Sequence, residues 1–348
     1  MRVAIVVSSE TRGGAEQYLY RLYSELRRTK NVEPILVGRL PDWSDNIGTS
    51  HAAGVTDKMT RRRPLASQAF SAVRSVRDIA QCVNSIKPDI VHIQFFKEKL
   101  LLPRMFKIMG YPVVWTEHSP LPTNFPPGGI TLLRRQAKHA NVISISRAVT
   151  ASLDSAGIAS ALIENPLPAV GNAQEVRDAA SPRSSPQVLY VGRLHKNKRV
   201  DLVVEAARML PHVQFGIVGE GPEYHALRIR AGENVTFYGN VDDVGRLYNQ
   251  CKIVVLPSGQ AAREGAPMVM LEARVAGAHV LMANDCHAIQ EAISLGCKAF
   301  DPVPTSLVDM IQGHLDSPRT EISPDIVKER SPEVWAHRHY EFFSRISG

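Results

Sequence analysis

Short apolar runs rich in valine and isoleucine recur along the first half of the chain, each followed by a turn and an amphipathic stretch. Val76, Ile79 and Val83, at spacings of three and four, are typical of a helix with one buried face. The predicted strands of this half cover residues 3–8, 32–38, 88–94, 112–118, 141–146 and 161–165, and the predicted helices cover 15–29 and 66–86.

The second half of the chain restarts the same pattern. Near-continuous apolar strands that alternate with helices indicate parallel sheets covered on both faces. The expected fold class is therefore α/β, with two doubly wound, Rossmann-like domains. The predicted strands of the second half cover residues 187–194, 213–219, 235–240, 252–258 and 279–284, and its first helix covers 200–210.

A change of composition marks the boundary between the two halves. Residues 166–186 are rich in proline, alanine and serine and lack periodicity, which indicates a linker or a long surface loop. The predicted domains are then residues 1–165 and 187–330. A second segment of weak pattern, residues 39–64, contains TRRRP (60–64) and is expected to be an exposed loop.

The amino-acid composition says more about the cellular environment of the chain than about any reaction that it performs. The 348 residues suit roughly two domains. An excess of 41 basic over 34 acidic residues suits phosphorylated ligands, nucleic acid or an anionic membrane, without choosing among them. Cys82, Cys251, Cys286 and Cys297 form neither a CxxC pair nor a zinc spacing, so they are expected to be free thiols in a reducing compartment.

The N-terminal segment gives no targeting signal. Its apolar run, Val3 to Val7, is too short for the central region of a signal peptide. No stretch of the chain reaches the ~18 apolar residues that a membrane span needs. The expected location is the cytoplasm, and peripheral association with the inner face of the membrane is left open.

Candidate ligand-binding residues follow the predicted strands, where open parallel sheets bind their ligands. Gly13 and Gly14 follow the first strand, where glycines let the backbone approach a phosphate at a helix N-terminus. An ordinary connecting turn is the alternative, and the lack of a GxGxxG motif argues against a dinucleotide site. His118 ends the strand 112–118, where a functional histidine and a structural one fit equally well.

Cations follow the first strand of the second half. Arg193 and Lys198, with Lys196 and Arg199 beside them, are well placed for a diphosphate, because arginine supplies a fork of donors and lysine a point charge. Solvated loop cations are the alternative. The nearby GEGP (219–222) resembles a phosphate-binding turn, although such turns are more often structural.

The segment REGAPMVMLEARVAG (263–277) carries two glutamates around a turn that should become a helix. Pro267 is expected in the first helical turn, so that backbone N–H groups of about residues 266–269 can hold an anion. Glu272, two turns along, suits the vicinal hydroxyls of a ribose, and Glu264 suits the hydroxyls of a sugar. Ordinary surface and helix-end acids are the alternative, but a carboxylate in such apolar company needs partners.

In their order along the chain, these motifs resemble those of the retaining glycosyltransferases of the GT-B fold, family 4. The resemblance implies two Rossmann-like domains that face each other across a cleft, with the acceptor on the first and the nucleotide-sugar donor on the second. A closing helix (331–348) would pack back on the first domain. The matching segments are GGAE (13–16), WTEH (115–118), VGRLHKNK (191–198), GEGP (219–222), FYGNV (237–241), EGAPMVMLEA (264–273) and SPEVWAHRHYEFFSRI (331–346).

The resemblance also implies roles for individual residues. Arg193 and Lys198 would neutralise the leaving diphosphate, and Glu272 would hold the ribose. Glu264 would hold sugar hydroxyls, and His118 would lie beside the donor sugar on the acceptor side. The remaining donor-binding residues would be Gly13, Gly14, Gly239, Gly265, Ala266, Pro267, Met268 and Val269.

The implied activity is transfer of a sugar from a nucleoside diphosphate sugar to an acceptor hydroxyl, with retention of configuration and without a metal or other cofactor. UDP- and GDP-sugars are the expected donors, and the acceptor is a small molecule, a lipid carrier or a glycan. A sugar-nucleotide epimerase and a non-catalytic nucleotide-sugar-binding protein are the alternatives. Nucleic acid is not expected as a partner, because the basic residues are dispersed. NDCHAIQE (284–291) lacks the family's usual glycine pair, which leaves the detail of the donor pocket open.

Overall fold

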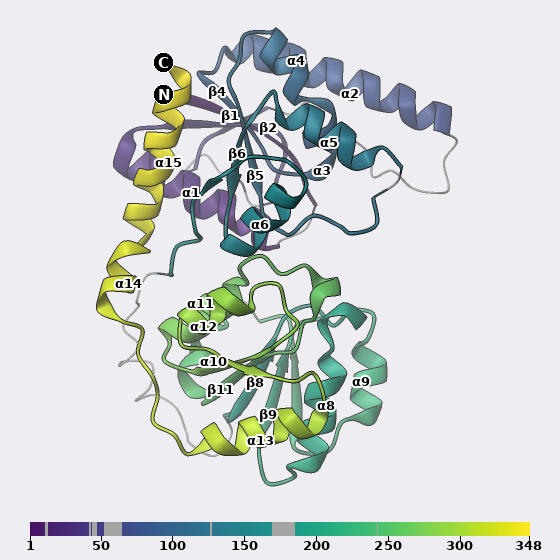
Figure 1. Cartoon of the computed structure of the whole chain (residues 1–348), viewed down its shortest axis with the longest axis vertical. Coiled ribbons are helices and arrows are strands. Elements are labelled where there is room, and N and C mark those ends of the chain that lie inside the picture. The colour runs from purple at the N-terminus through teal and green to yellow at the C-terminus, as the bar shows by residue number, and fades with distance from the viewer. Residues whose placement is uncertain are drawn as a thin grey trace. The chain divides into compact units, whose positions relative to one another are not determined.

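A computed structural model describes residues 1–10, 13–41, 43, 47–51, 65–125, 127–168, 185–241 and 243–348, with residues 65–73 described by their backbone. The TRRRP segment (60–64) and most of the predicted linker (169–184) lie outside these residues. The chain divides into two units, of which the first holds residues 1–165 and 332–348 and the second holds residues 166–331 (Figure 1).

The first unit is built on a parallel sheet. In the described residues, its strands follow the order β3-β2-β1-β4-β5-β6-β7. Residues 3–7 of β1 are at most 2% exposed, as expected for a strand that is covered on both faces. The strands are β1 (Arg2–Ser8), β2 (Glu33–Arg39), β3 (Thr49–His51), β4 (Ile90–Ile93), β5 (Val113–Glu117), β6 (Asn141–Ser144) and β7 (Ala161–Leu162).

Amphipathic helices cover this sheet. In the first of them, α1, the buried side chains of Leu19, Leu22 and Leu26 recur at helical spacing and face the core. The C-terminal helix, α15, packs against α1, as Figure 1 shows. The described helices of the unit are α1 (Gly14–Lys30), α2 (Leu65–Ile86), α3 (Phe96–Leu101), α4 (Pro103–Ile108), α5 (Gly129–Ala137), α6 (Arg147–Ser155) and α15 (Pro332–Ser347).

The expected exposed loop over residues 39–64 is wrong at one point, because Thr49–His51 form β3 at the edge of the first sheet. All three residues of β3 are exposed, so no alternation of apolar and polar positions marks this strand in the sequence. The short helices α3 and α4, of six residues each, also fall below the length at which periodicity becomes visible.

The second unit is also built on a parallel sheet. Its described strands follow the order β10-β9-β8-β11-β12-β13. With two parallel sheets, each covered by helices, the predicted α/β, doubly wound fold class is confirmed. The strands are β8 (Val188–Val191), β9 (Phe215–Val218), β10 (Val235–Gly239), β11 (Ile253–Leu256), β12 (His279–Ala283) and β13 (Lys298–Phe300).

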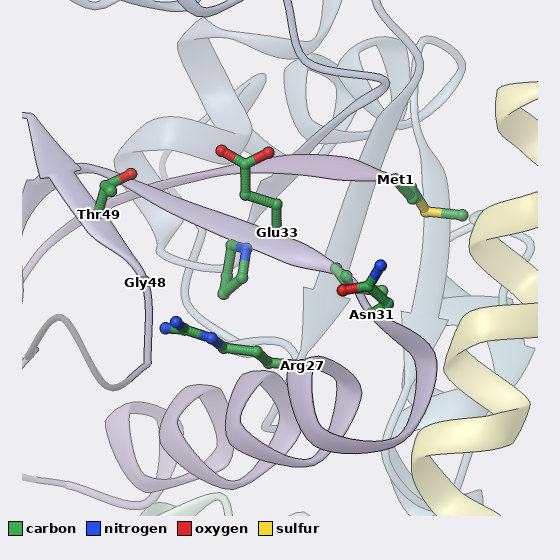
Figure 2. A pocket seen from close by; sticks show the side chains of 8 residues that line it. Met1, Arg27, Asn31, Glu33, Gly48 and Thr49 are labelled. Atoms are coloured by element: carbon green, nitrogen blue, oxygen red, sulfur yellow. The ribbon is translucent and has the colours of Figure 1, made fainter.

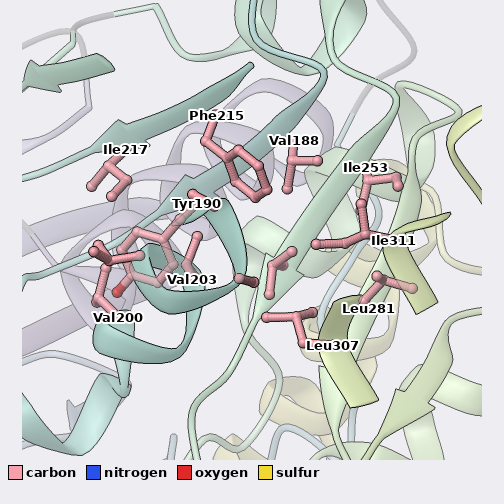
Figure 3. Close-up of a cluster of buried hydrophobic side chains, with 14 of the residues drawn as sticks. Val188, Tyr190, Val200, Val203, Phe215, Ile217, Ile253, Leu281, Leu307 and Ile311 are labelled. Atoms are coloured by element: carbon pink, nitrogen blue, oxygen red, sulfur yellow. The ribbon is translucent and has the colours of Figure 1, made fainter. Parts of the chain in front are cut away.

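Two apolar clusters fill the faces of the second sheet. On one face, side chains of β8 and β9 such as Tyr190 and Phe215 meet Val203 of α8 and Leu307 of α13 (Figure 3). On the other face, Leu189 and its neighbours meet α10, α11 and α12. The helices are α8 (Val200–Met209), α9 (Tyr224–Arg230), α10 (Gly245–Gln250), α11 (Met268–Val275), α12 (Ile289–Ser294), α13 (Pro304–Leu315) and α14 (Pro324–Glu329), with 3-10 turns at Lys196–Lys198 and Gln260–Ala262.

Two further expectations concern thiols and membrane spans. All four cysteines are free, and Cys251, Cys286 and Cys297 are buried. Within the described residues, no helix has both the length and the apolar character required to cross a bilayer.

Each sheet reverses its strand order next to its first strand. The chain runs outward from β1 through β2 to β3 and then returns to place β4 on the other side of β1. In the second sheet the reversal lies between β8 and β11. Ligands of open α/β sheets bind outside the carboxyl ends of the strands at such switch points. We therefore expect ligand-binding residues in the loops after β1, β4, β8 and β11.

A buried chain of hydrogen bonds fastens α15 to the first unit. Tyr18 OH and His339 Nε2 are 2.6 Å apart, and His339 Nδ1 lies 2.9 Å from the carbonyl oxygen of Trp335. The carbonyl can only accept, so Nδ1 carries the proton and Nε2 accepts from Tyr18. His92 continues the network with bonds to Tyr23 OH (2.6 Å) and Thr116 Oγ1 (2.8 Å).

Both histidines of this network are neutral in the folded chain. Burial lowers the pKa of His339 to about 4, and burial with the nearby His339 and Lys99 lowers the pKa of His92 to about 3. An unfolded histidine has a pKa of about 6.5. Between that pH and about 3 to 4, the unfolded chain binds protons that the folded chain excludes. The contribution of these two histidines to the stability of the first unit is therefore fully present above pH 6.5 and is lost as the pH falls through this window.

Replacing His339 with Gln, which keeps an acceptor for Tyr18 but does not titrate, should weaken the pH dependence of stability. We expect the slope of unfolding free energy against pH, between pH 6 and 4, to fall by up to about 1.4 kcal/mol per pH unit. Urea unfolding followed by tryptophan fluorescence measures the unfolding free energy of the first unit at each pH, because all three tryptophans, Trp43, Trp115 and Trp335, lie in that unit.

The matched control is His337→Gln, since His337 lies in the same helix with 51% of its side chain exposed. Its slope should equal that of the parent chain. Equal slopes for all three proteins would contradict the assignment of the pH dependence to the buried ring.

Candidate active site

Three loops of the first unit meet at the carboxyl ends of β1, β4 and β5. Gln94, which follows β4 and is 4% exposed, donates from its amide nitrogen to the carbonyl oxygen of Ala15 at 2.9 Å. Its Oε1 atom lies 2.8 Å from Nε2 of His118, which follows β5. The structure thus joins the predicted glycine turn to the predicted histidine through Gln94, a residue that the sequence analysis did not single out.

The two glycines before α1 have different surroundings. Glu16, 5% exposed, accepts a 2.5 Å hydrogen bond from Ser9 Oγ, and a Cβ atom at Gly13 would lie 2.8 Å from Glu16 Oε2. A Cβ atom at Gly14 would meet nothing within 4 Å. Gly13 therefore makes room for the Glu16 carboxylate, whereas Gly14 leaves open space beside the backbone.

His118 is half-buried and packs against the ring of Tyr18, with centroids 4.7 Å apart and planes at 82°. Burial, assisted by the charge of Lys99 and by His92, holds the pKa of His118 well below its ordinary value. The imidazole is therefore neutral near pH 7, and it can exchange hydrogen bonds without carrying charge.

A buried ion pair lies beneath this edge of the sheet. Lys99 Nζ contacts Glu117 Oε2 at 2.9 Å, with 3% and 10% of the two side chains exposed. Trp115 Nε1 donates to the same oxygen at 3.1 Å, so the carboxylate has the additional hydrogen bond that a buried ion pair requires. Sequence reasoning missed Lys99. The available signal was Glu117, a carboxylate in an apolar strand that cannot stay buried alone.

In the second unit, the loops after β8 and β11 meet at the switch point. Lys198 Nζ forms an ion pair with Glu264 Oε1, and Ser258 Oγ donates to the same oxygen at 3.1 Å. The side chain of Lys198 is 22% exposed and that of Glu264 is 18% exposed. Solvent therefore reaches the ion pair, although both groups are partly desolvated. The structure thus brings two of the predicted catalytic residues into direct contact.

Arg193 belongs to the same loop and is exposed, and its carbonyl oxygen accepts a 3.0 Å hydrogen bond from Tyr190 OH. Burial and the charge of Glu264 raise the pKa of Tyr190, and the charge of Arg193 opposes this shift. Both charges therefore act on one ring, which places Arg193 in the neighbourhood of the Lys198–Glu264 pair.

The glycines of GEGP (219–222) fix the position of the cationic loop. A Cβ atom at Gly219 (φ +121°) would lie 2.1 Å from the carbonyl oxygen of Gly192, and one at Gly221 (φ +157°) would lie 2.2 Å from that of Leu194. Leu194 N–H in turn donates to the carbonyl of Glu220 at 2.8 Å. The loops after β8 and β9 pack backbone against backbone, which only glycine allows, and the segment has a structural role.

Arg199 ties three loops together beside the ion pair. Its guanidinium binds both carboxylate oxygens of Asp285 at 2.9 and 2.7 Å, and a Cβ atom at Gly259 would lie 2.2 Å from Arg199 Nη2. The loops after β8, β11 and β12 are thereby held in one arrangement. Asp285 lies in the segment 284–291, which thus supplies the acid that fixes the cationic loop.

Helix α11 begins one residue later than expected. Pro267 was predicted in the first helical turn, but its extended backbone (ψ 123°) makes it the N-cap, and the helix starts at Met268. The carbonyl oxygen of Pro267 accepts from the N–H groups of Met270 and Leu271 at 3.0 and 3.4 Å. Gly265 and Ala266 are buried before this cap, and Val269 is half-buried in its first turn.

Glu272 and Gly239 complete the predicted donor set. Glu272 is half-buried in α11, and its Oε2 atom accepts from Tyr248 OH at 3.4 Å. Gly239 ends β10 with φ +64°, and its carbonyl oxygen accepts from Gly219 N–H at 2.7 Å. Because β10 is the edge strand of its sheet, Gly239 lies on one flank of the carboxyl edge rather than beside the Lys198–Glu264 pair.

A pocket of about 510 Å³ lies elsewhere in the first unit (Figure 2). Met1, Asn31 and Glu33 line it at the beginnings of β1 and β2, together with Thr49 of β3. The pocket is therefore at the amino-terminal edge of the sheet, opposite the edge that carries Gly13, Gln94 and His118, and is separate from the candidate site.

Two family models match the chain. The model for glycosyltransferase family 4 matches residues 12–167, and the model for glycosyl transferases group 1 matches residues 172–319. This chain belongs to the family 4 glycosyltransferases. It is accordingly a retaining glycosyltransferase that uses a nucleotide-sugar donor, and the predicted family and activity are confirmed.

Solved structures agree with this assignment in fold. HepE of Anabaena in complex with UDP is 18% identical, with a TM-score of 0.80 over 99% of this chain and 100% of that one. A glycosyltransferase of Rickettsia africae is 16% identical, with a TM-score of 0.77 over 99% and 98%. Sucrose-phosphate synthase of Thermosynechococcus elongatus is 17% identical, with a TM-score of 0.78 over 99% and 98%. No curated protein matches the glycosyltransferase in sequence.

The different surroundings of the two glycines predict different effects of alanine. Gly13→Ala should destabilise the first unit, because the new Cβ atom displaces the Glu16 carboxylate from its buried position. Gly14→Ala should leave stability unchanged or raise it by up to about 1 kcal/mol, since alanine favours a helix over glycine. Urea unfolding followed by tryptophan fluorescence compares the two variants, and an equal loss in both would refute the distinction.

Proposed function

We propose that the enzyme transfers a sugar from a UDP- or GDP-sugar to an acceptor hydroxyl, with the donor held by the second unit. The observation that carries this proposal is the Lys198–Glu264 ion pair at the switch point of the second sheet. A cation for a diphosphate and a carboxylate for sugar hydroxyls are in contact there, so one ligand can reach both. The UDP and UDP-glucose complexes of HepE make uridine nucleotides the first donors to test.

The difficult step is departure of the nucleoside diphosphate while positive charge develops on the sugar. Lys198 and Arg193 stabilise the negative charge on the leaving phosphate, and the packed loops after β8 and β9 fix the backbone that carries them. The proposal therefore assigns charge neutralisation to protein cations rather than to a metal ion. Lys198 gains a phosphate partner when the donor binds, which frees the Glu264 carboxylate to accept from sugar hydroxyls.

The remaining donor contacts come from α11 and its neighbours. The backbone of Gly265 to Val269, at the start of α11, faces the diphosphate with the positive end of the helix dipole. Glu272 accepts from the ribose hydroxyls, with its carboxylate oriented by Tyr248 OH. The backbone of Gly239 meets the base.

On the acceptor side, the neutral imidazole of His118 lies beside the transferred sugar. A neutral ring exchanges hydrogen bonds with hydroxyl groups and adds no charge to the positive sugar of the transition state. Gly14, with open space where a side chain would be, lets the backbone approach the donor, and Gly13 shapes this turn through Glu16.

A sugar-nucleotide epimerase is the alternative reaction. It would consume the donor without any acceptor and would give another sugar nucleotide as its product. Incubation with the donor alone, followed by separation of the sugar nucleotides, distinguishes the two: transfer needs an acceptor and releases the nucleoside diphosphate.

Lys198→Ala should lower turnover by about 10²- to 10³-fold, because a fixed charge aimed at the leaving group is lost. The donor is first identified as the UDP- or GDP-sugar that raises the melting temperature of the parent chain by mass action. Release of nucleoside diphosphate in the presence of acceptor then gives kcat. Lys298→Ala, which removes an exposed lysine at the start of β13 in the same unit, is the matched control and should keep kcat within about twofold. Near-normal turnover of Lys198→Ala would refute the assigned role.

The exposed face of α4 favours an acceptor that lies at an anionic lipid surface. Arg104, Lys107 and Ile108 are exposed at helical spacing on one face, with Ile108 75% exposed. Residues 99–153 contain a single acidic side chain, Glu117, which is already paired with Lys99. Basic side chains around an exposed apolar group are the composition that binds anionic headgroups.

Arg104→Glu with Lys107→Glu should weaken binding to vesicles that contain anionic phospholipid by more than about tenfold, measured by co-sedimentation. Vesicles of neutral phospholipid should bind neither protein. Lys298→Glu with Lys328→Glu makes the same change of net charge on exposed positions of the second unit, and it should bind like the parent chain. Equal binding by both double variants would rule out the α4 face.

A further inference from the structure

Gln94 is held in a defined orientation at the switch point of the first sheet. An amide side chain has a donor nitrogen and an acceptor oxygen, and its orientation follows from its partners. The carbonyl oxygen of Ala15 can only accept, so the group that lies 2.9 Å from it is the NH₂ of Gln94. The amide oxygen therefore faces His118.

This orientation determines the tautomer of His118. Gln94 Oε1 is an acceptor, so the imidazole nitrogen 2.8 Å away, Nε2, must carry a proton. The ring is neutral because of its burial and the charge of Lys99, so it carries only this one proton. Nδ1 is thus left with a lone pair and acts as a hydrogen-bond acceptor.

The surroundings of His118 restrict rotation of the ring. Tyr18 packs edge-on against it at 4.7 Å between centroids, and Tyr18 is itself fixed by the 2.6 Å hydrogen bond to His339 of α15. Gln94 is 4% exposed, so water does not compete strongly for its amide. One hydrogen bond and one ring contact therefore define the direction of Nδ1.

We propose that Gln94 is a positioning residue for sugar transfer: it fixes His118 as the Nε2–H tautomer, so that Nδ1 accepts a hydrogen bond from a hydroxyl of the transferred sugar or of the acceptor. This inference rests on the proposed function, which places His118 beside the sugar. The same amide joins His118 to the first turn of α1, so the histidine and the glycine turn keep a constant separation.

The tautomer can be measured directly in the full-length chain. Two-bond ¹H–¹⁵N correlation spectra of protein labelled with ¹⁵N-histidine distinguish a protonated ring nitrogen from an unprotonated one. The signals of His118 among the 12 histidines are assigned by their loss in His118→Gln. We expect a protonated Nε2 and an unprotonated Nδ1 in the parent chain at pH 7.5. The opposite pattern would overturn the proposal.

Variants of Gln94 separate positioning from folding. Gln94→Leu should abolish the single-tautomer pattern and lower kcat by about 10²-fold, with a smaller change in KM for the donor, because the reacting groups are misplaced rather than lost. Gln94→Glu keeps an acceptor oxygen for Nε2–H, and it should retain the His118 pattern and more turnover than Gln94→Leu. Gln136→Leu, which removes a side-chain amide whose oxygen accepts from the backbone N–H of Arg104 in the same unit, is the matched control and should change neither readout.

Three results would contradict the inference. They are an unchanged His118 pattern in Gln94→Leu, normal turnover of Gln94→Leu despite an altered pattern, and equal losses in Gln94→Leu and Gln94→Glu. Failure of the proposed function appears separately, as absence of transfer by the parent chain with every donor and acceptor tried. The spectra are independent of transfer, so they decide the tautomer in either case.

Discussion

The reversal of strand order beside the first strand of each sheet is the constraint on which the site depends. At that point the loops that follow adjacent strands leave in opposite directions, so their backbone groups are not covered by a connecting helix. In the second unit the Lys198–Glu264 pair bridges the two loops, and in the first unit Gln94 bridges Ala15 and His118. The candidate site residues therefore lie where the parallel topology leaves the carboxyl edge of each sheet open.

The two bridges differ in electrostatic character. In the second unit the contact is between full charges that solvent reaches, which suits a ligand that carries phosphate. In the first unit it is between a neutral imidazole and an amide, and the buried Lys99 and Glu117 beneath this edge of the sheet neutralise each other as a pair. This division suits a family of enzymes that bind an anionic leaving group and neutral hydroxyl groups on separate surfaces.

The sequence predicted the architecture because buried parallel strands are near-continuous apolar runs, and β3 escaped because its three exposed residues carry no such pattern. Candidate site residues were found where they follow a strand in sequence. Gln94, Lys99 and Asp285 were missed because their importance lies in partners 79, 18 and 86 positions away, respectively. Pairings across that distance are created by the fold, and a single sequence shows only that a buried polar group needs some partner.

The position of α15 has a consequence for biosynthesis. This helix contributes Trp335, His339 and Phe343 to the buried interior of the first unit, yet it follows the whole second unit in the chain. Domains generally fold in the order in which the ribosome makes them. Here the second unit can complete its core during translation, while the first must hold an apolar face uncovered until α15 leaves the exit tunnel. The half of the molecule that is made first is thus the half that finishes folding last.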